Sequence, residues 1–221
     1  MDINFYILFL KSKDGEMEKG MCQEVFELLK KMDLSKVETR LALQCAPVIT
    51  GIKIANLLIV PSKEEERVSE VLKGTGIQHY CLDRQLEKTT YLLFRVPELV
   101  AYLNEENVRD ILTQVGYEDL SIVGVLTLLQ NRYVSYMKNR KDFPHEMGIL
   151  LGYSIEDVEG FLKNKGENFL YAGYWKVYEN VEDKKLLFEA YESAKEGLLL
   201  LVGHGYPIRG IIEYLQEKFT Y

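Results

Sequence analysis

A histidine stands next to a glutamate at His145-Glu146, directly after Phe143-Pro144. Such a pair can work as a general acid and base, or can supply one metal ligand and a proton shuttle. The second histidine of a His-Glu-x-x-His zinc helix is missing, because Ile149 stands in its place. Pro144 and Glu146 also suit the first turn of a helix, so a purely structural role is the alternative.

Cys45 is the residue that we consider as a nucleophile, with the His-Glu pair as its base. A reactive thiolate needs a cation or a helix N-terminus nearby, and Lys53 is a cation close in sequence. However, Cys45 continues the apolar spacing of Val37 and Leu41 toward the C-terminal end of a predicted helix, where the helix dipole opposes ionisation. A buried structural cysteine is therefore the favoured interpretation.

A run of aromatic residues surrounds one lysine late in the chain. In an extended strand, Tyr174, Lys176 and Tyr178 lie on one face, and Trp175 and Val177 lie on the other. An aromatic face with one cation can stack a planar ligand or contact a partner. A half-buried edge of the core is the structural alternative.

Residues 147–163 resemble a helix-turn-helix, because Leu151-Gly152-Tyr153-Ser154 forms a turn before a capped helix. A DNA-reading helix should present Arg, Lys, Asn or Gln to the bases. This helix instead opens with Glu156, Asp157 and Glu159, which would face phosphates. We therefore keep DNA binding only as a third hypothesis.

Three segments together resemble a bacterial family that is a domain of unknown function. They are Cys45-Ala46-Pro47 with Gly51-Ile52-Lys53, Phe143 to Glu146 with Gly148 and Leu151 to Tyr153, and Gly173 to Tyr178. The resemblance spans about residues 20–215. It implies a shared fold, leaves a shared site open, and carries no activity. The pattern predicts cysteines just before the third segment, but Tyr171 and Ala172 stand there, which argues against a thiol or metal role near that strand.

The net charge of the chain limits the classes of partner that it can attract. Its 221 residues carry a net charge of −7, so we expect no general attraction to nucleic acid. The densest basic group is Lys138, Arg140 and Lys141.

Three scattered cysteines and three histidines indicate neither a disulfide framework nor a metal site. The apolar run 3–10 is too short for a membrane span and lacks the order of a signal peptide, so we expect a cytoplasmic protein without membrane contact.

The elements that must position these residues follow from periodicity and caps. We expect strands at about 3–11, 55–60, 77–82, 89–96 and 169–178. We expect helices near 21–32, 37–46, 65–73, 99–112, 119–138, 145–151, 155–165, 181–202 and 208–219, with capping boxes at Ser35/Glu38, Ser62/Glu65 and Ser154/Asp157. The pattern predicts an α+β fold, predominantly helical, with one mixed sheet of about four or five strands. We expect a single domain over 1–221, with 138–142 as the place for any sub-domain boundary.

Three functions remain open at this stage. The first is a ligand- or partner-binding protein without a complete catalytic site, which contacts a small molecule or a protein through Lys53, Tyr174, Lys176 and Tyr178. The second is an enzyme that uses Cys45 as nucleophile and His145/Glu146 as acid-base pair. The third is DNA binding through 147–163. The sequence indicates no particular cofactor or oligomeric state.

Overall fold

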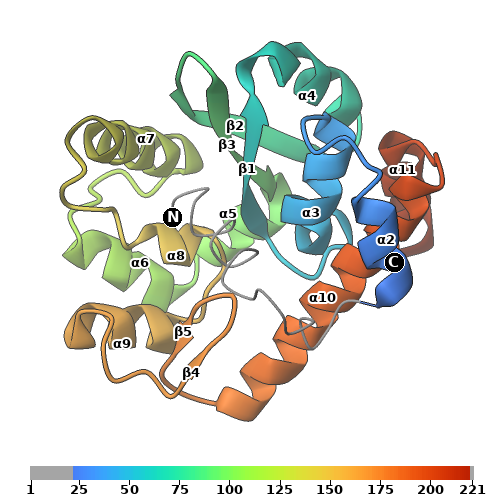
Figure 1. Cartoon of the computed structure of the whole chain (residues 1–221). Coiled ribbons are helices and arrows are strands. Elements are labelled where there is room, and N and C mark those ends of the chain that lie inside the picture. The colour runs from blue at the N-terminus through green and yellow to red at the C-terminus, as the bar shows by residue number, and fades with distance from the viewer. Residues whose placement is uncertain (1–21, 220–221) are drawn as a thin grey trace.

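The computed structural model describes residues 22–219, so the strand expected at about 3–11 lies outside the described residues. The α-helices are α2 (Gln23–Leu29), α3 (Val37–Ile49), α4 (Glu65–Leu72), α5 (Val96–Leu103), α6 (Glu106–Gln114), α7 (Ile122–Asn139), α8 (Met147–Leu150), α9 (Ile155–Asn164), α10 (Val181–Gly203) and α11 (Ile208–Phe219). The strands are β1 (Ala55–Pro61), β2 (Ile77–Arg84), β3 (Lys88–Arg95), β4 (Tyr171–Ala172) and β5 (Lys176–Val177). Figure 1 shows their arrangement.

The predominantly helical α+β fold is confirmed, but the single mixed sheet is wrong. The described residues form a three-stranded sheet of order β1-β3-β2, with both pairs antiparallel, and a separate two-stranded hairpin of β4 and β5. The segment expected as one strand at 169–178 turns back on itself, because Gly173 N–H bonds the carbonyl of Trp175. It pairs with itself and does not extend the larger sheet.

The outer edge of β1 is covered by side chains of α3. Gln44 pairs with Ile59 much as a neighbouring strand would, because its Oε1 accepts from the backbone N–H at 2.9 Å and its Nε2 donates to the carbonyl at 3.2 Å. Arg40 also donates to the Ile59 carbonyl at 2.9 Å. Backbone groups on a sheet edge would otherwise invite another strand. These side chains give one physical reason why the sheet does not continue past β1.

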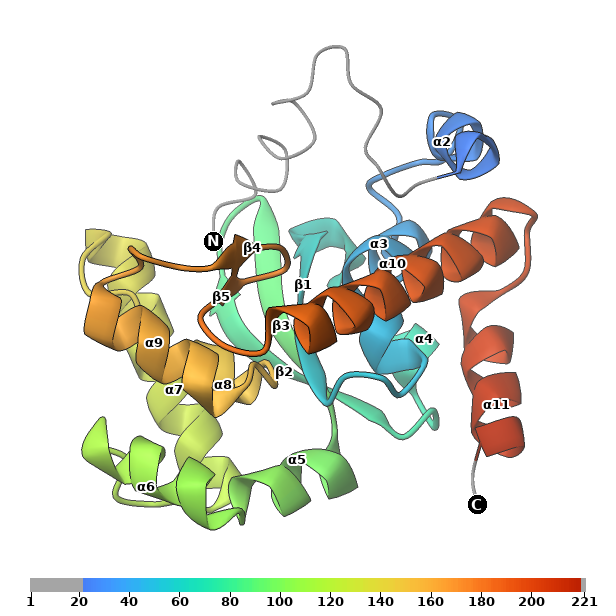
Figure 2. The same ribbon diagram turned by 90° about the horizontal axis from the view of Figure 1, so that it is seen from below.

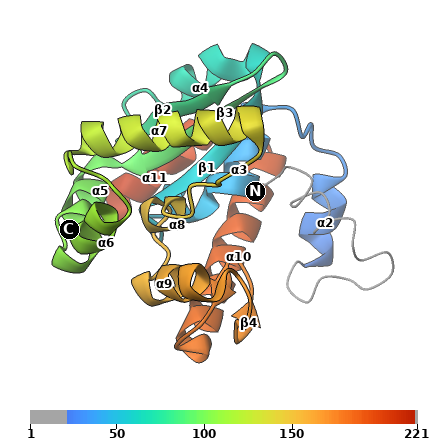
Figure 3. The same cartoon turned by 90° about the vertical axis from the view of Figure 1, so that its left-hand side faces the viewer.

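Helices cover both faces of the three-stranded sheet. On one face, α3, α4, α10 and α11 pack against Leu58, Val60 and Leu93. On the other, α5 to α9 pack against Leu92 and Phe94. Figure 2 shows the sheet between these two helical groups. In Figure 3, α7 crosses β2 and β3, where its Gln130 donates to a β2 carbonyl.

A third, smaller cluster holds the hairpin. Trp175 and Val177 from the hairpin pack with Phe188 and Tyr191 of α10. A two-stranded hairpin is only marginally stable alone, so this packing keeps it in place. Within residues 22–219, no helix is both long and apolar enough to cross a membrane.

None of the three expected capping boxes forms, although Ser154 does occupy the N-cap of α9, where its hydroxyl donates to Asp157 and caps no helix N–H. Lys36, not Ser35, is the N-cap of α3, and the hydroxyl of Ser35 instead donates to Asp33. Ser62 opens a short 3-10 turn (Ser62–Glu64) and donates to the carbonyl of Gln85. The Ser35 bond is local, whereas Ser62 reaches the turn between β2 and β3, and either bond takes the hydroxyl away from capping. The sequence pattern therefore located these helices but not their capping bonds.

Candidate functional site

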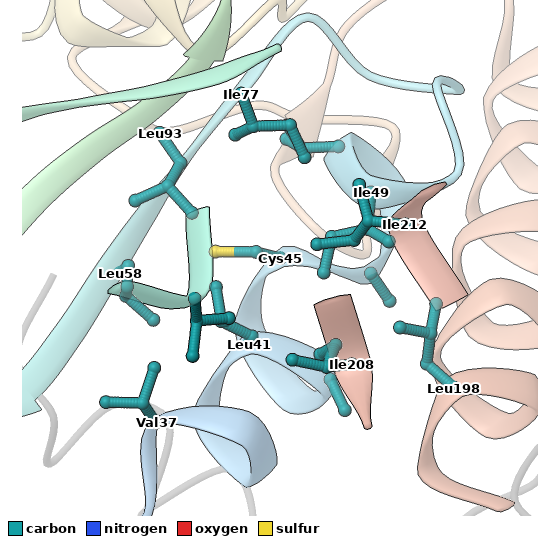
Figure 4. Close-up of a cluster of buried hydrophobic side chains, with 14 of the residues drawn as sticks. Val37, Leu41, Cys45, Ile49, Leu58, Ile77, Leu93, Leu198, Ile208 and Ile212 are labelled. Carbon is teal, nitrogen blue, oxygen red and sulfur yellow. The ribbon is translucent and has the colours of Figure 1, made fainter. Parts of the chain in front are cut away.

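Cys45 lies in the aliphatic core and not in a cleft. It is 0% exposed, and Figure 4 shows its sulfur among Leu41, Leu58 and other apolar side chains. Its Sγ lies 3.5 Å from the carbonyl of Leu57. Burial raises the pKa of the thiol, and the charge of Lys53 lowers it only in part. The geometry thus gives the nucleophile hypothesis no support.

This burial predicts a slow reaction of Cys45 with thiol reagents. In the folded protein, a disulfide reagent should react at once with the exposed Cys22, whereas Cys45 should react only as fast as the protein unfolds. Mass spectrometry of quenched time points measures both rates. Reaction of Cys45 as rapid as that of Cys22, under conditions where the circular dichroism is native, would contradict this placement.

His145 and Glu146 are neighbours in sequence but lie in different environments. His145 is exposed, and its ring centre lies 5.4 Å from that of Phe143 and 4.9 Å from that of Phe161. Partial burial lowers its pKa, and the Glu146 carboxylate opposes that shift. Because Cys45 lies in the core on the other side of the sheet, the structure does not assemble these three residues into one catalytic site.

Glu146 is buried and forms an ion pair with α7. Its Oε1 accepts from Arg132 at 2.6 Å and from the Tyr117 hydroxyl at 3.2 Å. Arg132 also donates to the carbonyl of Val115, and its guanidinium lies 4.8 Å from the ring centre of Tyr117. Burial raises the pKa of Tyr117, so the phenol stays protonated and donates a hydrogen bond to Glu146. Glu146 thus holds the segment 143–146 against α7.

Lys53 is buried although it carries an amine. It is 5% exposed, and its Nζ donates to Asn56 Oδ1 at 2.7 Å. The Nζ also lies 5.2 Å from the ring centre of Tyr153 and 5.8 Å from that of Tyr191. Burial lowers its pKa to about 7. A lysine is seldom buried without a paired carboxylate, so this position stands out in the molecule.

The three sequence segments meet at this lysine. Tyr153, from the second segment, lies between Lys53 of the first and Trp175 of the third, and it stacks on Trp175 with ring centres 4.4 Å apart. The indole N–H of Trp175 donates to Asp157 Oδ2 at 2.7 Å. Asp157 Oδ1 accepts from the backbone N–H of Tyr178 at 2.7 Å. The segments therefore form one junction between α3, α9, the hairpin and α10.

The three ligand-binding candidates of the third segment already use their polar ends inside the protein. The Tyr174 hydroxyl donates to Glu192 at 2.6 Å, and the Tyr178 hydroxyl donates to the carbonyl of Glu167 at 3.1 Å. Lys176 donates to the carbonyl of Gly166 at 2.6 Å, beyond the end of α9. These contacts fix the hairpin against α9 and α10.

A row of aromatic rings runs along the surface beside this junction. Tyr136, Phe143, His145 and Phe161 contact one another in that order, with ring centres 4.9 to 5.4 Å apart. The row is half-buried or exposed along its length. It begins near the C-terminal end of α7 and ends on α9.

A groove of about 880 Å³ opens at the α7 end of this row. Phe143 and Pro144 supply apolar walls, and Lys138 and Lys141 supply cations. The Arg132–Glu146 pair also lines it, and Asp142 adds a second carboxylate. Seven of its ten lining residues are polar or charged, so the groove suits a charged ligand better than an apolar one.

The family model described as "Protein of unknown function (DUF3793)" matches residues 41–214. The chain belongs to this family. The expected resemblance to a domain of unknown function is thereby confirmed, and the family description names no activity. No curated protein and no solved structure matches the chain.

The match to the DUF3793 family includes both the junction and the groove. Sequence reasoning singled out Lys53 and the third segment, but it assigned Asp157 only to a capping box. Ser154 does donate to Asp157 Oδ2, yet the main partners of that carboxylate come from the hairpin. The Ser-x-x-Asp pattern gave no signal that Asp157 binds the hairpin.

The helix-turn-helix hypothesis gains no support from the geometry. Within 147–163, Asp157 is buried in the junction, while Glu156 and Glu159 are exposed at the start of α9. Exposed carboxylates at that place would repel phosphates. In the part of the chain from 22 to 219, no three histidine, cysteine or acidic side chains gather as a metal site.

Proposed function

We propose that the protein binds a small organic anion in the groove between the end of α7 and the segment 143–146. The observation that carries this proposal is the groove itself, with apolar walls at Phe143 and Pro144 and cations at Lys138 and Lys141. The aromatic row continues from Phe143 and offers a face for a planar group. The protein thus acts as a binding protein in the cytoplasm.

The charges of the groove favour a negative ligand. Among residues 22–219, neither Lys138 nor Lys141 has an ion-pair partner. Arg132 and Glu146 neutralise each other, which leaves two cations against the single carboxylate of Asp142. On a chain with a net charge of −7, a local excess of positive charge attracts an anion.

The Arg132–Glu146 pair gives the groove a fixed wall. Because Glu146 accepts two hydrogen bonds and Arg132 donates to a backbone carbonyl as well, both side chains are held in one geometry. A site that is already ordered binds with a smaller loss of conformational entropy. The buried pair therefore supports binding by shape and does not need to contact the ligand charge.

The test uses 1-anilinonaphthalene-8-sulfonate, an aromatic anion whose fluorescence rises in an apolar site. The double variant Lys138→Gln/Lys141→Gln should weaken its binding about fivefold, because two exposed charge contacts are worth about 1 kcal/mol together. Added salt should weaken binding to the unchanged protein as well. Fluorescence titration gives the dissociation constant of each protein.

The matched control is Lys163→Gln/Lys165→Gln, which removes the same charge from an exposed place at the end of α9. This control should bind the probe as the unchanged protein does. Equal weakening in both double variants would show only a net-charge effect. That result, or an unchanged dissociation constant in both double variants, would contradict the proposal.

A further inference from the structure

The groove at the end of α7 presents unpaired charges of both signs. Lys138, Lys141 and Asp142 all line it, and all three are exposed. Although they follow one another closely in the chain, none of the three forms an ion pair with any residue between 22 and 219. The buried pair of Arg132 and Glu146 differs, because those two charges neutralise each other. The groove therefore offers a ligand a free carboxylate as well as free cations.

The end of α7 adds partial negative charge beside Asp142. The helix ends at Asn139, which lines the groove, and Arg140 follows as its left-handed C-cap. The N–H of Arg140 bonds the carbonyl of Tyr136, which leaves the carbonyls of residues 137–139 without a partner inside the helix. This end of a helix dipole favours a cation. In Figure 3 the chain leaves α7 here and turns toward α8.

An aromatic wall stands next to these charges. The ring centre of Phe143 lies 5.0 Å from that of Tyr136 and 5.4 Å from that of His145. Phe143 is half-buried and His145 is exposed, so part of this aromatic surface is open to a ligand. The groove volume of about 880 Å³ falls within the range of roughly 300–1,000 Å³ found for small-molecule sites. The groove thus suits a small molecule that has a ring and charges of both signs.

We propose that the ligand of the groove is an aromatic zwitterion of the size of an amino acid, an inference that rests on the anion site proposed above. Its carboxylate contacts Lys138 and Lys141, its ammonium contacts Asp142 and the carbonyl end of α7, and its ring packs on Phe143. A simple anion uses the two lysines but is repelled by the Asp142 carboxylate. An ammonium group on the same ligand converts that repulsion into an attraction.

Three ligands that share an indole ring separate these contacts. L-Tryptophan carries both charges, indole-3-propionate lacks the ammonium, and tryptamine lacks the carboxylate. Titration of each ligand with the full chain, followed by the NMR signals of the indole, gives the three dissociation constants even when binding is weak. We expect tryptophan to bind about fivefold more tightly than either analogue, because an exposed charge contact contributes a factor of this order.

The variant Asp142→Asn tests the ammonium contact. It should remove the preference for tryptophan over indole-3-propionate, and it should leave the binding of indole-3-propionate unchanged or stronger. Asparagine tolerates the left-handed φ of 54° at this position as aspartate does, so the turn is kept. The matched control Asp183→Asn removes the same charge from an exposed place at the start of α10, and it should keep the preference.

The outcomes distinguish this inference from the anion site. Indole-3-propionate or tryptamine that binds as tightly as tryptophan would overturn the zwitterion, as would a preference for tryptophan that survives in Asp142→Asn. The anion site stands in these cases if Lys138→Gln/Lys141→Gln still weakens the binding of indole-3-propionate. If that double variant changes the binding of neither indole-3-propionate nor the sulfonate probe, the anion site fails and the zwitterion fails with it.

Discussion

Replacing Lys53 by methionine is expected to stabilise the protein, and the gain should be larger in acid than in base. The pKa of Lys53 is lowered from 10.5 to about 7 by burial. Each unit of such a shift corresponds to about 1.4 kcal/mol of folding free energy. Methionine has a similar length and no charge, so it removes the desolvation penalty and leaves only the amide of Asn56 without its partner.

The direction of the pH dependence follows from proton binding. Between pH 7 and 10.5 the unfolded chain holds a proton on Lys53 that the folded chain has lost. The stability of the unchanged protein therefore rises with pH across this window. Below pH 7 both states carry the proton, and the penalty is fully present. The advantage of Lys53→Met should thus shrink by about 3 kcal/mol between pH 6 and pH 9.5.

Urea unfolding of both proteins at the two pH values measures this difference. The exposed variant Lys163→Met serves as the control, and its difference from the unchanged protein should be the same at both values. A gap between Lys53→Met and the unchanged protein that does not depend on pH would mean that Lys53 titrates as it does in the unfolded chain.

The sequence predicted most elements because their periodicity is local. The last helix is found at Ile208–Phe219 as expected, and the strand expected at 55–60 is found at Ala55–Pro61. The sheet was predicted less well. Gln44 covers the edge of β1 through contacts across 15 positions, and no local pattern reveals such a bond. The hairpin of β4 and β5 instead closes through a local turn at Gly173 and Trp175, which strand propensity does not reveal.

The candidate site was predicted only in part. Lys53 was singled out, but a lysine is expected at the surface, and only the fold shows that Tyr153 and Tyr191 enclose it. Cys45 was expected in the core from its apolar spacing, and it lies there. The groove was not predicted, because it joins Lys138 and Phe143 through the turn that follows α7.

The variant Asp157→Ala is expected to lose about 3 to 5 kcal/mol of stability, because it removes one carboxylate that a buried indole and two part-buried donors share. Asp157 is 2% exposed and accepts from the indole of Trp175, the backbone of Tyr178 and the hydroxyl of Ser154. Alanine supplies no acceptor, so the buried indole and the part-buried backbone N–H both lose their partner. The variant Glu156→Ala, on the exposed side of the same turn, should change stability by about 0.5 kcal/mol or less.

The single tryptophan of the chain makes the loss visible where it occurs. Trp175 stacks on Tyr153 and packs against Phe188, so its emission reports the docking of the hairpin on α10. In Asp157→Ala, the unfolding transition seen by tryptophan emission should occur at a lower temperature than the transition seen by far-ultraviolet circular dichroism. The reason is that the hairpin loses its anchor before the two larger cores unfold.

In a Trp175→Phe background, Asp157→Ala should lose less stability, because the indole that donates to Asp157 is already gone. Equal losses in both backgrounds would show that the indole bond contributes nothing, and coincident transitions would show that the junction of the three segments unfolds with the cores as one unit.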